Sequence, residues 1–334
     1  LQGTLIELSL PKAKNLFEKA QHLIKRIHLV KAAKQTHQLQ LVISFLDIPN
    51  LINVLSKTPG CATAISIRNY KTVTGHGKND LAVLQAATDY FYPKADAIVS
   101  LSKLIALHTQ KRLKHDPEKI RIIYNPVPLS EIVARSLDVH PIFIQKEPSL
   151  LTFVSMGRMQ SQKGTWHLLK AFHQVHQAHP LTRLILIGHD YSHGKVTGLI
   201  RELHLEEAVV MTGQLDNPYP VLALSDIYVL SSLSEGFSNA LVEAMACGCA
   251  VVAADCKSSP REILSPESPI EMSCQGIEKA PYGILTTAFD QSEDWRATVI
   301  EKADQDLARG MIELIQDPSL CQHNQNLSPL RAAE

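Results

Sequence analysis

The stretch I-Y-V-L-S-S-L-S-E-G-F-S-N-A-L-V-E-A-M, at residues 227–245, decides the predicted fold, because it encodes a strand, a turn and a helix in direct succession. Ile227–Leu230 is a short apolar run, Gly236 permits a tight turn, and Ser238 or Asn239 can cap the helix that follows. A helix that begins at the carboxyl end of a strand presents unpaired backbone N–H groups and the positive end of its dipole. We therefore predict an α/β unit with an anion site, suited to phosphate, at its turn.

Two carboxylates accompany this turn. Glu235 lies in the loop, and Glu243 is expected in about the first turn of the helix. Carboxylates accept hydrogen bonds from sugar hydroxyls, so a phosphate site flanked by both suits a nucleotide sugar. On spacing alone a second interpretation stays open, in which Glu243 is an acid favoured by the helix dipole and Glu235 is an ordinary loop residue.

A second polar element follows another expected strand. Gly157 and Arg158 end that strand, and Lys163 and Gly164 open the next helix. Arginine offers a planar fork for phosphate oxygens, and lysine offers a mobile point charge. Two cations at the carboxyl end of a strand would neutralise a diphosphate. The alternative is a solvated arginine and lysine on a surface loop.

Strands and helices are expected to alternate along the whole chain. Short runs rich in Val, Ile and Leu predict strands buried on both faces. These runs are Leu39–Phe45, Ala62–Ser66, Ala97–Leu101, Ile120–Tyr124, Leu150–Ser155, Arg183–Gly188, Val209–Thr212, Ile227–Leu230 and Ala250–Ala253, with a weaker one at Thr4–Leu8. Helices are predicted at Ala13–Ala33, Leu81–Tyr90, Gly164–Gln177 and Asn239–Met245. This alternation indicates parallel sheets covered by helices.

A proline-rich segment, Asn125–Glu147, interrupts the alternation and is interpreted as a linker. We expect one Rossmann-like domain over residues 1–135 and a second over residues 136–334. The first is expected to be incomplete at its start, since no Gly-rich turn from a strand to a helix is found there. Doubly wound domains bind ligands at the carboxyl ends of their strands, so two sheets that face each other would hold a ligand in the cleft between them.

Composition excludes several classes of protein. Lys plus Arg equals Asp plus Glu, at 33 each, so no net charge recruits nucleic acid. No apolar run is long enough for a transmembrane helix, and no signal peptide is visible. The chain lacks an initiator Met, which suggests a fragment or a processed chain. The 6 cysteines show no C-x-x-C spacing, which favours free thiols in a reducing cytoplasm.

In combination these elements resemble the retaining glycosyltransferases of family four, whose GT-B fold consists of two Rossmann-like domains. The E-x7-E signature of that family matches Glu235 and Glu243, and its Gly-Arg … Lys-Gly element matches residues 157–164. The resemblance covers roughly Leu39 to Ile315. It implies the transfer of a hexose or N-acetylhexosamine from a UDP-sugar to a glycan or lipid-linked acceptor, with retention. The family usually needs no metal, and no D-x-D element is placed for one.

The resemblance also implies roles for individual residues. Arg158 and Lys163 would contact the donor diphosphate and stabilise the charge that develops on it, while Glu235 would hold hydroxyls of the donor sugar. These three are the implied catalytic residues. Glu243 would accept hydrogen bonds from the ribose hydroxyls. The implied donor-binding residues are Gly157, Arg158, Lys163, Glu235, Gly236, Phe237, Ser238, Asn239, Ala240, Leu241 and Glu243.

Two departures from the family pattern bear on catalysis and on the choice of acceptor. The Gly-rich loop near the start is not found, and Ser66-Ile67-Arg68-Asn69 carries Ile67 where close members often have an acidic residue. The main alternative is therefore a catalytically impaired GT-B scaffold that binds a nucleotide sugar. A UDP-sugar epimerase of the same fold is a second alternative, against which the combined Gly-Arg/Lys and E-x7-E elements argue.

A basic helix near the start allows two interpretations. Its lysines recur from Lys12 to Lys34. Such a face in the family often rests on anionic lipid beside a lipid-linked acceptor, which would place the protein at the inner face of the membrane. The alternative, which we favour on sequence alone, is a solvated helix face on a cytoplasmic protein.

Overall fold

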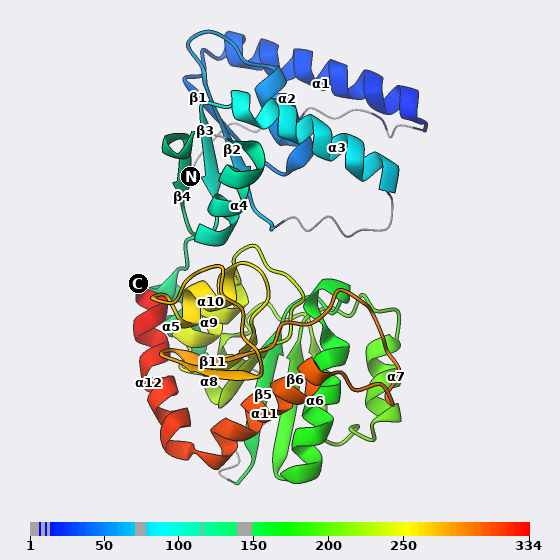
Figure 1. Ribbon diagram of the computed structural model, residues 1–334, viewed down its shortest axis with the longest axis vertical. Coiled ribbons are helices and arrows are strands. Elements are labelled where there is room, and N and C mark those ends of the chain that lie inside the picture. Colours follow the sequence, from blue (N-terminus) through cyan, green and yellow to red (C-terminus); the bar gives the residue numbers. More distant parts are fainter. Residues whose placement is uncertain (1–6, 8–10, 12–13, 71–77, 115, 139–148) are drawn as a thin grey trace. The chain divides into compact units, whose positions relative to one another are not determined.

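The computed structural model describes residues 7, 11, 14–70, 78–114, 116–138 and 149–334. The chain divides into two compact units, Leu1–Tyr124 and Asn125–Glu334, and each is considered by itself (Figure 1).

The described part of the first unit contains a four-stranded sheet whose strands are all parallel and follow the order of the chain, β1-β2-β3-β4. Its strands are β1 (Leu41–Phe45), β2 (Ala62–Ile67), β3 (Ala97–Ser100) and β4 (Ile120–Ile122). Its helices are α1 (Leu16–Thr36), α2 (Asp47–Leu55), α3 (Lys78–Phe91) and α4 (Lys103–Leu113), with short 3-10 turns at Tyr92–Lys94 and Pro117–Lys119. Asn15 caps α1 and Ser102 caps α4, because each side-chain oxygen accepts a hydrogen bond from a backbone N–H in the first turn.

The core of this unit lies between the sheet and α2, α3 and α4, and it is centred on Ile65 and Ile98. Edge strand β1 departs from the prediction of strands buried on both faces. Leu41, Ile43 and Phe45 are each at least half exposed, because the described helices cover only the opposite face of β1, where Ser44 bonds Asn50 of α2.

The second unit contains a seven-stranded sheet among its described residues, in the order β10-β11-β9-β8-β5-β6-β7. All neighbouring strands are parallel except β10 and β11. The strands are β5 (Leu151–Met156), β6 (Thr182–Ile187), β7 (Val209–Gly213), β8 (Ile227–Leu230), β9 (Ala250–Ala254), β10 (Ile277–Ala280) and β11 (Gly283–Thr286). The helices are α5 (Leu129–Ser136), α6 (Thr165–Ala178), α7 (Lys195–Glu202), α8 (Tyr219–Leu224), α9 (Asn239–Ala246), α10 (Ser259–Leu264), α11 (Lys302–Gln316) and α12 (Pro318–Ala333).

Both faces of this sheet are buried, which explains why its strands are apolar without alternation. On one face, Phe153 and alternate strand residues pack against α6, α7 and α11. On the other face, the intervening residues, such as Val154 and Tyr228, pack against α8, α9 and α10 (Figure 1). The predicted strands of both units are confirmed to within two residues at each end, except Thr4–Leu8, of which only Glu7 is described.

The prediction that Asn125–Glu147 is a linker is wrong for its first part. Residues Leu129–Ser136 form α5, which packs on α8 and α9 through the fully buried Ile132. The second unit therefore begins after Tyr124, earlier than the predicted boundary after residue 135. Pro128 occupies the N-cap of α5, where its missing N–H costs no hydrogen bond, so the prolines precede this helix and do not exclude it.

Two neighbouring strands of the second unit meet through glycines. A Cβ atom on Gly188, after β6, would lie 2.0 Å from the carbonyl oxygen of Gly157, after β5, and Gly188 has a φ of +136°. Only glycine satisfies both the backbone angle and this distance. The carboxyl ends of β5 and β6 therefore approach each other more closely than a side chain would allow.

We predict that Gly188→Ala lowers the free energy of unfolding of the second unit by about 2–4 kcal/mol, because the new methyl group forces the two strand ends apart. Both tryptophans, Trp166 and Trp295, lie in the second unit, so urea unfolding followed by tryptophan fluorescence reports on it. Gly198→Ala in α7 is the control. Its Cβ meets nothing within 4 Å, and alanine should stabilise the helix by about 0.5–1 kcal/mol. Equal unfolding midpoints for the two variants would contradict the prediction.

Candidate functional site

The predicted site residues follow three strands that are neighbours in the second sheet. The sheet order β9-β8-β5 brings together the loops that leave the carboxyl ends of these strands. The loop after β5 carries Arg158 and Lys163, and the loop after β8 carries Glu235. The loop after β9, residues 255–258, contacts the Glu235 loop and was not identified as part of the site from sequence.

Gly164 allows the first two loops to meet. Its φ is +57°, and a Cβ atom on it would lie 2.2 Å from the carbonyl oxygen of Ser231. The side chain of Lys163 lies across Gly157, whose own Cβ would be 3.1 Å from the lysine Cε. The two glycines of the Gly-Arg … Lys-Gly element therefore have steric roles. Gly164 makes room for the backbone of the loop after β8, and Gly157 makes room for the side chain of Lys163.

The most prominent contact of the site joins Lys163 to Glu235. The lysine Nζ donates to Glu235 Oε1 at 2.7 Å, and the Ser232 hydroxyl donates to the same oxygen at 2.6 Å. The lysine side chain is 23% exposed and the glutamate side chain 7%, so the pair is largely buried. Residues predicted to contact the diphosphate and the sugar are thus already in contact with each other.

Further hydrogen bonds hold the two loops together. Gln162 accepts from the Leu233 N–H with its carbonyl at 2.9 Å and donates to the Ser234 carbonyl with its amide at 2.8 Å. The Ser231 hydroxyl donates to the Lys163 carbonyl at 2.9 Å. These bonds flank the ion pair in sequence on both loops, so they fix the position of Lys163 relative to Glu235.

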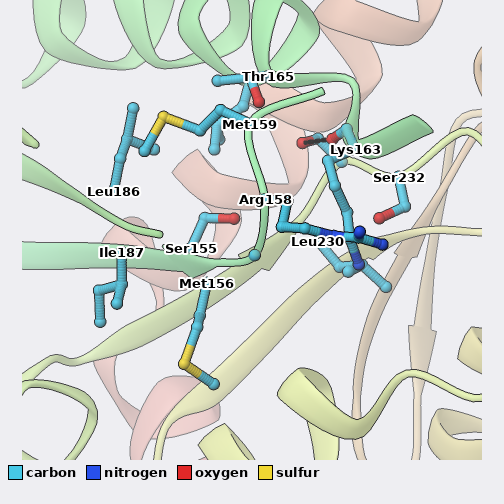
Figure 2. Close-up of a pocket in the computed structure, with 13 residues that line it drawn as sticks. Ser155, Met156, Arg158, Met159, Lys163, Thr165, Leu186, Ile187, Leu230 and Ser232 are labelled. Carbon is cyan, nitrogen blue, oxygen red and sulfur yellow. Dashed lines mark hydrogen bonds between the residues drawn. The ribbon is translucent and has the colours of Figure 1, made fainter. Parts of the chain in front are cut away.

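A pocket opens beside this pair. It is lined by Ser155, Met156, Gly157, Arg158, Met159, Lys163, Thr165, Leu168, Leu186, Ile187, Leu230, Ser231 and Ser232. Figure 2 shows the ends of the Arg158 and Lys163 side chains and the Ser232 hydroxyl pointing toward the same part of the pocket. Arg158 is exposed, and its guanidinium has no hydrogen-bond or ion-pair partner among the described residues. The pocket therefore combines one unpaired cation with one paired cation, an arrangement suited to an anion with several oxygens.

Glu243 is the fifth residue of α9, at the start of its second turn, close to the predicted place in about the first turn. The helix begins at Asn239, four residues before Glu243, because the preceding residues form the loop. The carboxylate of Glu243 has no hydrogen-bond partner among the described residues, and partial burial raises its pKa. Burial, followed by the charges of Glu235 and Glu243, also raises the pKa of the buried Tyr228.

The start of α9 differs from the predicted anion site. Ser238 occupies the N-cap position, but its hydroxyl bonds no N–H group and is buried without a partner. Three N–H groups expected to face a ligand are used within the protein: Ser238 donates to Ser259 Oγ, Asn239 to the Phe237 carbonyl, and Leu241 to the Ser238 carbonyl. The Gly236 N–H donates to no acceptor in the described part of the chain.

The segment after β11 that contains Glu293 and Trp295 supports the Lys163 loop, and the sequence did not predict this role. Glu293 accepts hydrogen bonds from Ser161, from Lys195 of α7 at 2.7 Å and from the Trp295 ring nitrogen at 2.5 Å. The bond from Lys195, followed by that from Ser161, lowers the pKa of Glu293 to about 2. The segment has no periodic pattern that would predict a helix or a strand. Its one indication of a packing role is Trp295, a large apolar residue in an otherwise polar stretch. Ser161 stands two residues before Lys163, and Glu293 therefore anchors the loop that carries the cation.

Comparison with known proteins places the second unit within one family. The family described as "Glycosyl transferases group 1" matches residues 151–317. An uncharacterized glycosyltransferase of Methanocaldococcus jannaschii is 32% identical over 246 residues, which are 71% of this chain and 60% of the relative. The N-acetylgalactosamine-N,N'-diacetylbacillosaminyl-diphospho-undecaprenol 4-alpha-N-acetylgalactosaminyltransferase of Campylobacter jejuni is 31% identical over 226 residues, 67% of this chain and 60% of the relative. The chain thus spans about 60% of the length of these relatives.

Solved structures share the fold. A glycosyltransferase from Rickettsia africae superposes with a TM-score of 0.72 at 15% identity, over 98% of this chain and 79% of the other. The Anabaena protein HepE, solved in complex with UDP, gives a TM-score of 0.65 at 18% identity, over 93% of this chain and 78% of the other. The predicted fold class, α/β of the GT-B type with parallel sheets in two Rossmann-like domains, is confirmed.

The support from Glu293 predicts a pH-dependent contribution to stability. Its pKa in the folded protein, about 2, lies below the ordinary value of 4.5, so the ionised carboxylate stabilises the fold above about pH 4.5, and this stabilisation is lost as the pH falls toward 2. We expect Glu293→Gln to lower the free energy of unfolding by about 1 kcal/mol or less at pH 7, since the pair with Lys195 is partly exposed.

Urea unfolding of the two proteins at pH 7, 4 and 3 checks this expectation. The difference between wild type and Glu293→Gln should shrink as the pH falls. Glu206→Gln, at an exposed position before β7, is the control and should change the free energy of unfolding by less than about 0.5 kcal/mol at every pH. A Glu293→Gln effect that stays constant from pH 7 to 3 would show that the carboxylate charge is not the cause.

Proposed function

The chain belongs to the group 1 glycosyl transferases, and from this premise we propose that it transfers a hexose or N-acetylhexosamine from a UDP-sugar to a hydroxyl of a glycan or lipid-linked acceptor, with retention. The observation that carries the proposal is the pocket beside the Lys163–Glu235 pair, where an unpaired arginine and a paired lysine point toward the same space.

Two relatives support the choice of donor and acceptor. HepE, which shares the fold, was solved with UDP, and this favours a uridine diphosphate as the carrier of the sugar. The Campylobacter relative is named for transfer to a diphospho-undecaprenol-linked sugar, which favours a lipid-linked acceptor. The exposed side of Arg158 and the neutral hydroxyls that line the same pocket are compatible with a diphosphate.

We assign the donor diphosphate to Arg158 and Lys163. As the bond between the anomeric carbon and the distal phosphate oxygen breaks, negative charge grows on the diphosphate, and these cations stabilise it. The acceptor oxygen then forms the new bond to that carbon on the same face, and its proton passes to an oxygen of the departing diphosphate. The protein supplies charge and position for this step, and no metal or organic cofactor is part of the proposal.

The two carboxylates have different assignments. Glu235 is almost fully buried and would accept hydrogen bonds from hydroxyls of the donor sugar, for which Lys163 and Ser232 already orient it. Glu243 is only partly buried, and its carboxylate has no partner in the described part of the chain, so it is assigned to the ribose hydroxyls. A hydrogen-bonding sugar hydroxyl would offset the desolvation that raises the pKa of this carboxylate.

The alternative is a scaffold that binds the nucleotide sugar without turnover. It rests on Ile67, which ends β2 where close members of the family often have an acidic residue. A carboxylate at this position would be able to act on an acceptor hydroxyl, and isoleucine is not.

We expect UDP to bind in the presence of a chelator, because the proposed contacts are side-chain cations. Calorimetry should give a Kd between about 1 μM and 1 mM. Lys163→Met should weaken UDP binding about 10-fold or more, the effect of losing one charged hydrogen bond. Glu235→Gln should leave UDP affinity equal or higher, since it frees Lys163 from its partner, but should lower transfer by about 100-fold or more.

Lys302→Met, an exposed lysine at the start of α11, is the matched control and should bind UDP as the wild type does. Absence of UDP binding by the folded wild type would overturn the donor assignment. Wild-type turnover by a folded Glu235→Gln would overturn the role of the carboxylate. Release of sugar from UDP-glucose, UDP-galactose or their N-acetylamino forms would exclude the scaffold alternative.

Contact with a membrane surface is the remaining proposal about partners. None of the described helices is long and apolar enough to cross a bilayer. On α1, Phe17 is 72% exposed and Ile24 is 56% exposed, and these two residues are seven positions apart and therefore on one face. Exposed Lys25 and Lys31 lie beside them, whereas Lys12 lies outside the described residues. A helix face that exposes apolar and basic side chains together favours binding to the surface of an anionic membrane.

We expect the protein to sediment with vesicles that contain one third phosphatidylglycerol and not with pure phosphatidylcholine vesicles, and Lys25→Glu/Lys31→Glu should reduce binding about 10-fold. The control is Lys111→Glu/Lys114→Glu at the end of α4, which changes the same net charge away from α1. Equal loss of binding by both double variants would indicate that net charge, not the face of α1, attracts the vesicles.

A further inference from the structure

The loop between β9 and α10 is closed by a buried ion pair. Asp255 follows the last residue of β9, and Arg261 is the third residue of α10. Arg261 donates from Nε and Nη2 to Asp255 Oδ2, at 3.1 and 2.7 Å. The two side chains are 2% and 3% exposed.

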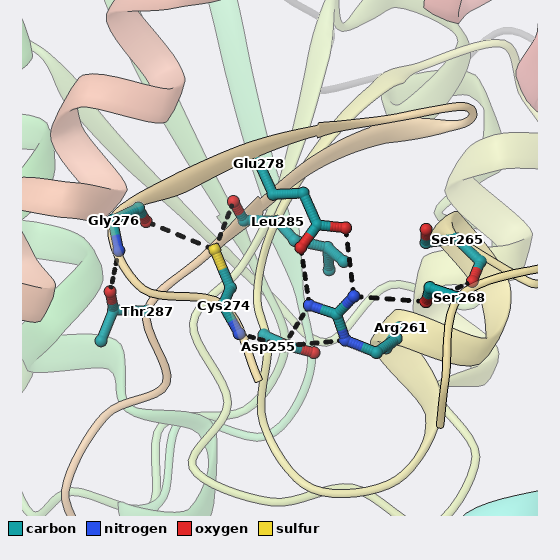
Figure 3. A network of polar contacts seen from close by, with 9 residues as sticks. All are labelled: Asp255, Arg261, Ser265, Ser268, Cys274, Gly276, Glu278, Leu285 and Thr287. Atoms are coloured by element: carbon teal, nitrogen blue, oxygen red, sulfur yellow. Dashed lines mark hydrogen bonds and ion pairs between the residues drawn. The ribbon is translucent and has the colours of Figure 1, made fainter. Parts of the chain in front are cut away.

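Two further contacts fix the guanidinium in place (Figure 3). Glu278 of β10 accepts from Nη1 at 3.1 Å and from Nη2 at 2.8 Å, and the Ser268 hydroxyl accepts from Nη1 at 3.2 Å. The Cys274 N–H donates to Asp255 Oδ2 at 2.7 Å. Burial alone would lower the pKa of Arg261, but the bonds to Glu278 and Asp255 raise it, so the side chain stays charged. We name Asp255, Arg261 and Glu278 the clamp.

The backbone that the clamp encloses is strained. Ser258 has φ 107° and ψ −99°, a region that residues other than glycine rarely adopt. Such a conformation persists only where the surroundings hold it. The clamp joins the two ends of residues 256–260, so it restrains the strained residue from both sides.

This strained loop holds the segment that carries Glu235. The Ser258 hydroxyl donates to the Gly236 carbonyl at 2.6 Å, and Ser259 Oγ accepts from the Ser238 N–H at 3.0 Å. The Lys257 carbonyl accepts from the Glu235 N–H at 3.4 Å. The Glu235 segment is thus held by the Lys163 loop on one side and by residues 257–259 on the other.

We propose that Arg261 is a positioning residue for the donor site, which acts through Ser258 and Ser259 to hold Glu235 and the Gly236–Ser238 backbone where the sugar of the donor binds. The inference rests on the proposed function. A buried ion pair is often no more stabilising than well-packed apolar side chains, so stability alone does not account for the clamp. A planar guanidinium, however, fixes the angle between two carboxylates, which a lysine ammonium does not.

The test compares Arg261→Lys with Arg331→Lys. Arg331 of α12 also bonds α10, but through the carbonyls of Glu262 and Ile263, beyond the loop. Hydrolysis is measured with whichever of UDP-glucose, UDP-galactose and their N-acetylamino forms the wild type cleaves fastest, and UDP affinity is measured by calorimetry. We expect Arg261→Lys to lower kcat/KM for the donor by about 10- to 100-fold, with UDP affinity within about threefold of the wild type. Arg331→Lys should change neither by more than about threefold.

A double-variant cycle separates positioning from a general loss of structure. Ser259→Ala removes the acceptor of the Ser238 N–H and leaves the clamp intact, so it should lower kcat/KM in the same direction. If Arg261 acts through Ser259, the combined variant should lose less than the product of the two single effects. Multiplicative effects of the two substitutions on kcat/KM would overturn the proposal. A loss of UDP affinity in Arg261→Lys as large as its loss of kcat/KM would overturn it as well. Ser259→Ala also serves alone if Arg261→Lys does not fold, and full activity of this variant would then overturn the proposal.

Hydrogen exchange at the Ser238 amide tests the same contact without turnover. We expect exchange at least about 10-fold faster in Arg261→Lys than in the wild type and unchanged exchange in Arg331→Lys. A wild type that releases no sugar from any donor refutes the proposed function, and the exchange result then decides the positioning role by itself. Unchanged exchange at Ser238 in Arg261→Lys would overturn it.

Discussion

The carbonyl oxygen of Ser231 occupies the space that any side chain on Gly164 would need, and the geometry of the site depends on this close approach. Because the loops after β5 and β8 meet there without a side chain between them, Lys163 reaches Glu235 at 2.7 Å, and Gln162 bonds both Leu233 and Ser234. The close approach of Gly188 to Gly157 fixes the distance between the ends of β5 and β6 in the same way. Backbone proximity at the carboxyl ends of parallel strands is thus the constraint from which the site follows.

The charges of the site are divided between paired and unpaired groups. Lys163 and Glu235 neutralise each other inside the loop contact, whereas the Arg158 guanidinium and the Glu243 carboxylate have no partner among the described residues. A ligand with a diphosphate and hydroxyls would find one open cation and one open carboxylate, and it would compete with Glu235 for the lysine. The paired groups in turn depend on supports that never touch the pocket, namely Glu293 beneath the Lys163 loop and the clamp beside the Glu235 loop.

The elements that the sequence predicted well are those whose burial is uniform. Strand β8 begins and ends as predicted, and α9 begins as predicted, because an apolar strand and a glycine turn are local signals. Helix α5 was assigned to a linker, since prolines precede it and its one fully buried residue, Ile132, gains meaning only from α8 and α9. The sequence also did not predict the antiparallel strand β10 or the exposed face of β1. Both depend on which strand or helix lies beside them in the folded protein, and a local pattern does not show this.

The sequence by itself determined the α/β class and the charged residues of the loops after β5 and β8, because these follow from local periodicity and from residues that are close in the chain. Only the tertiary structure decided how those residues are used. It paired Lys163 with Glu235, which are far apart in sequence. It also recruited Asp255, Arg261 and Glu278, whose roles are invisible in a linear pattern, because a buried ion pair exists only once strand order has brought its partners together.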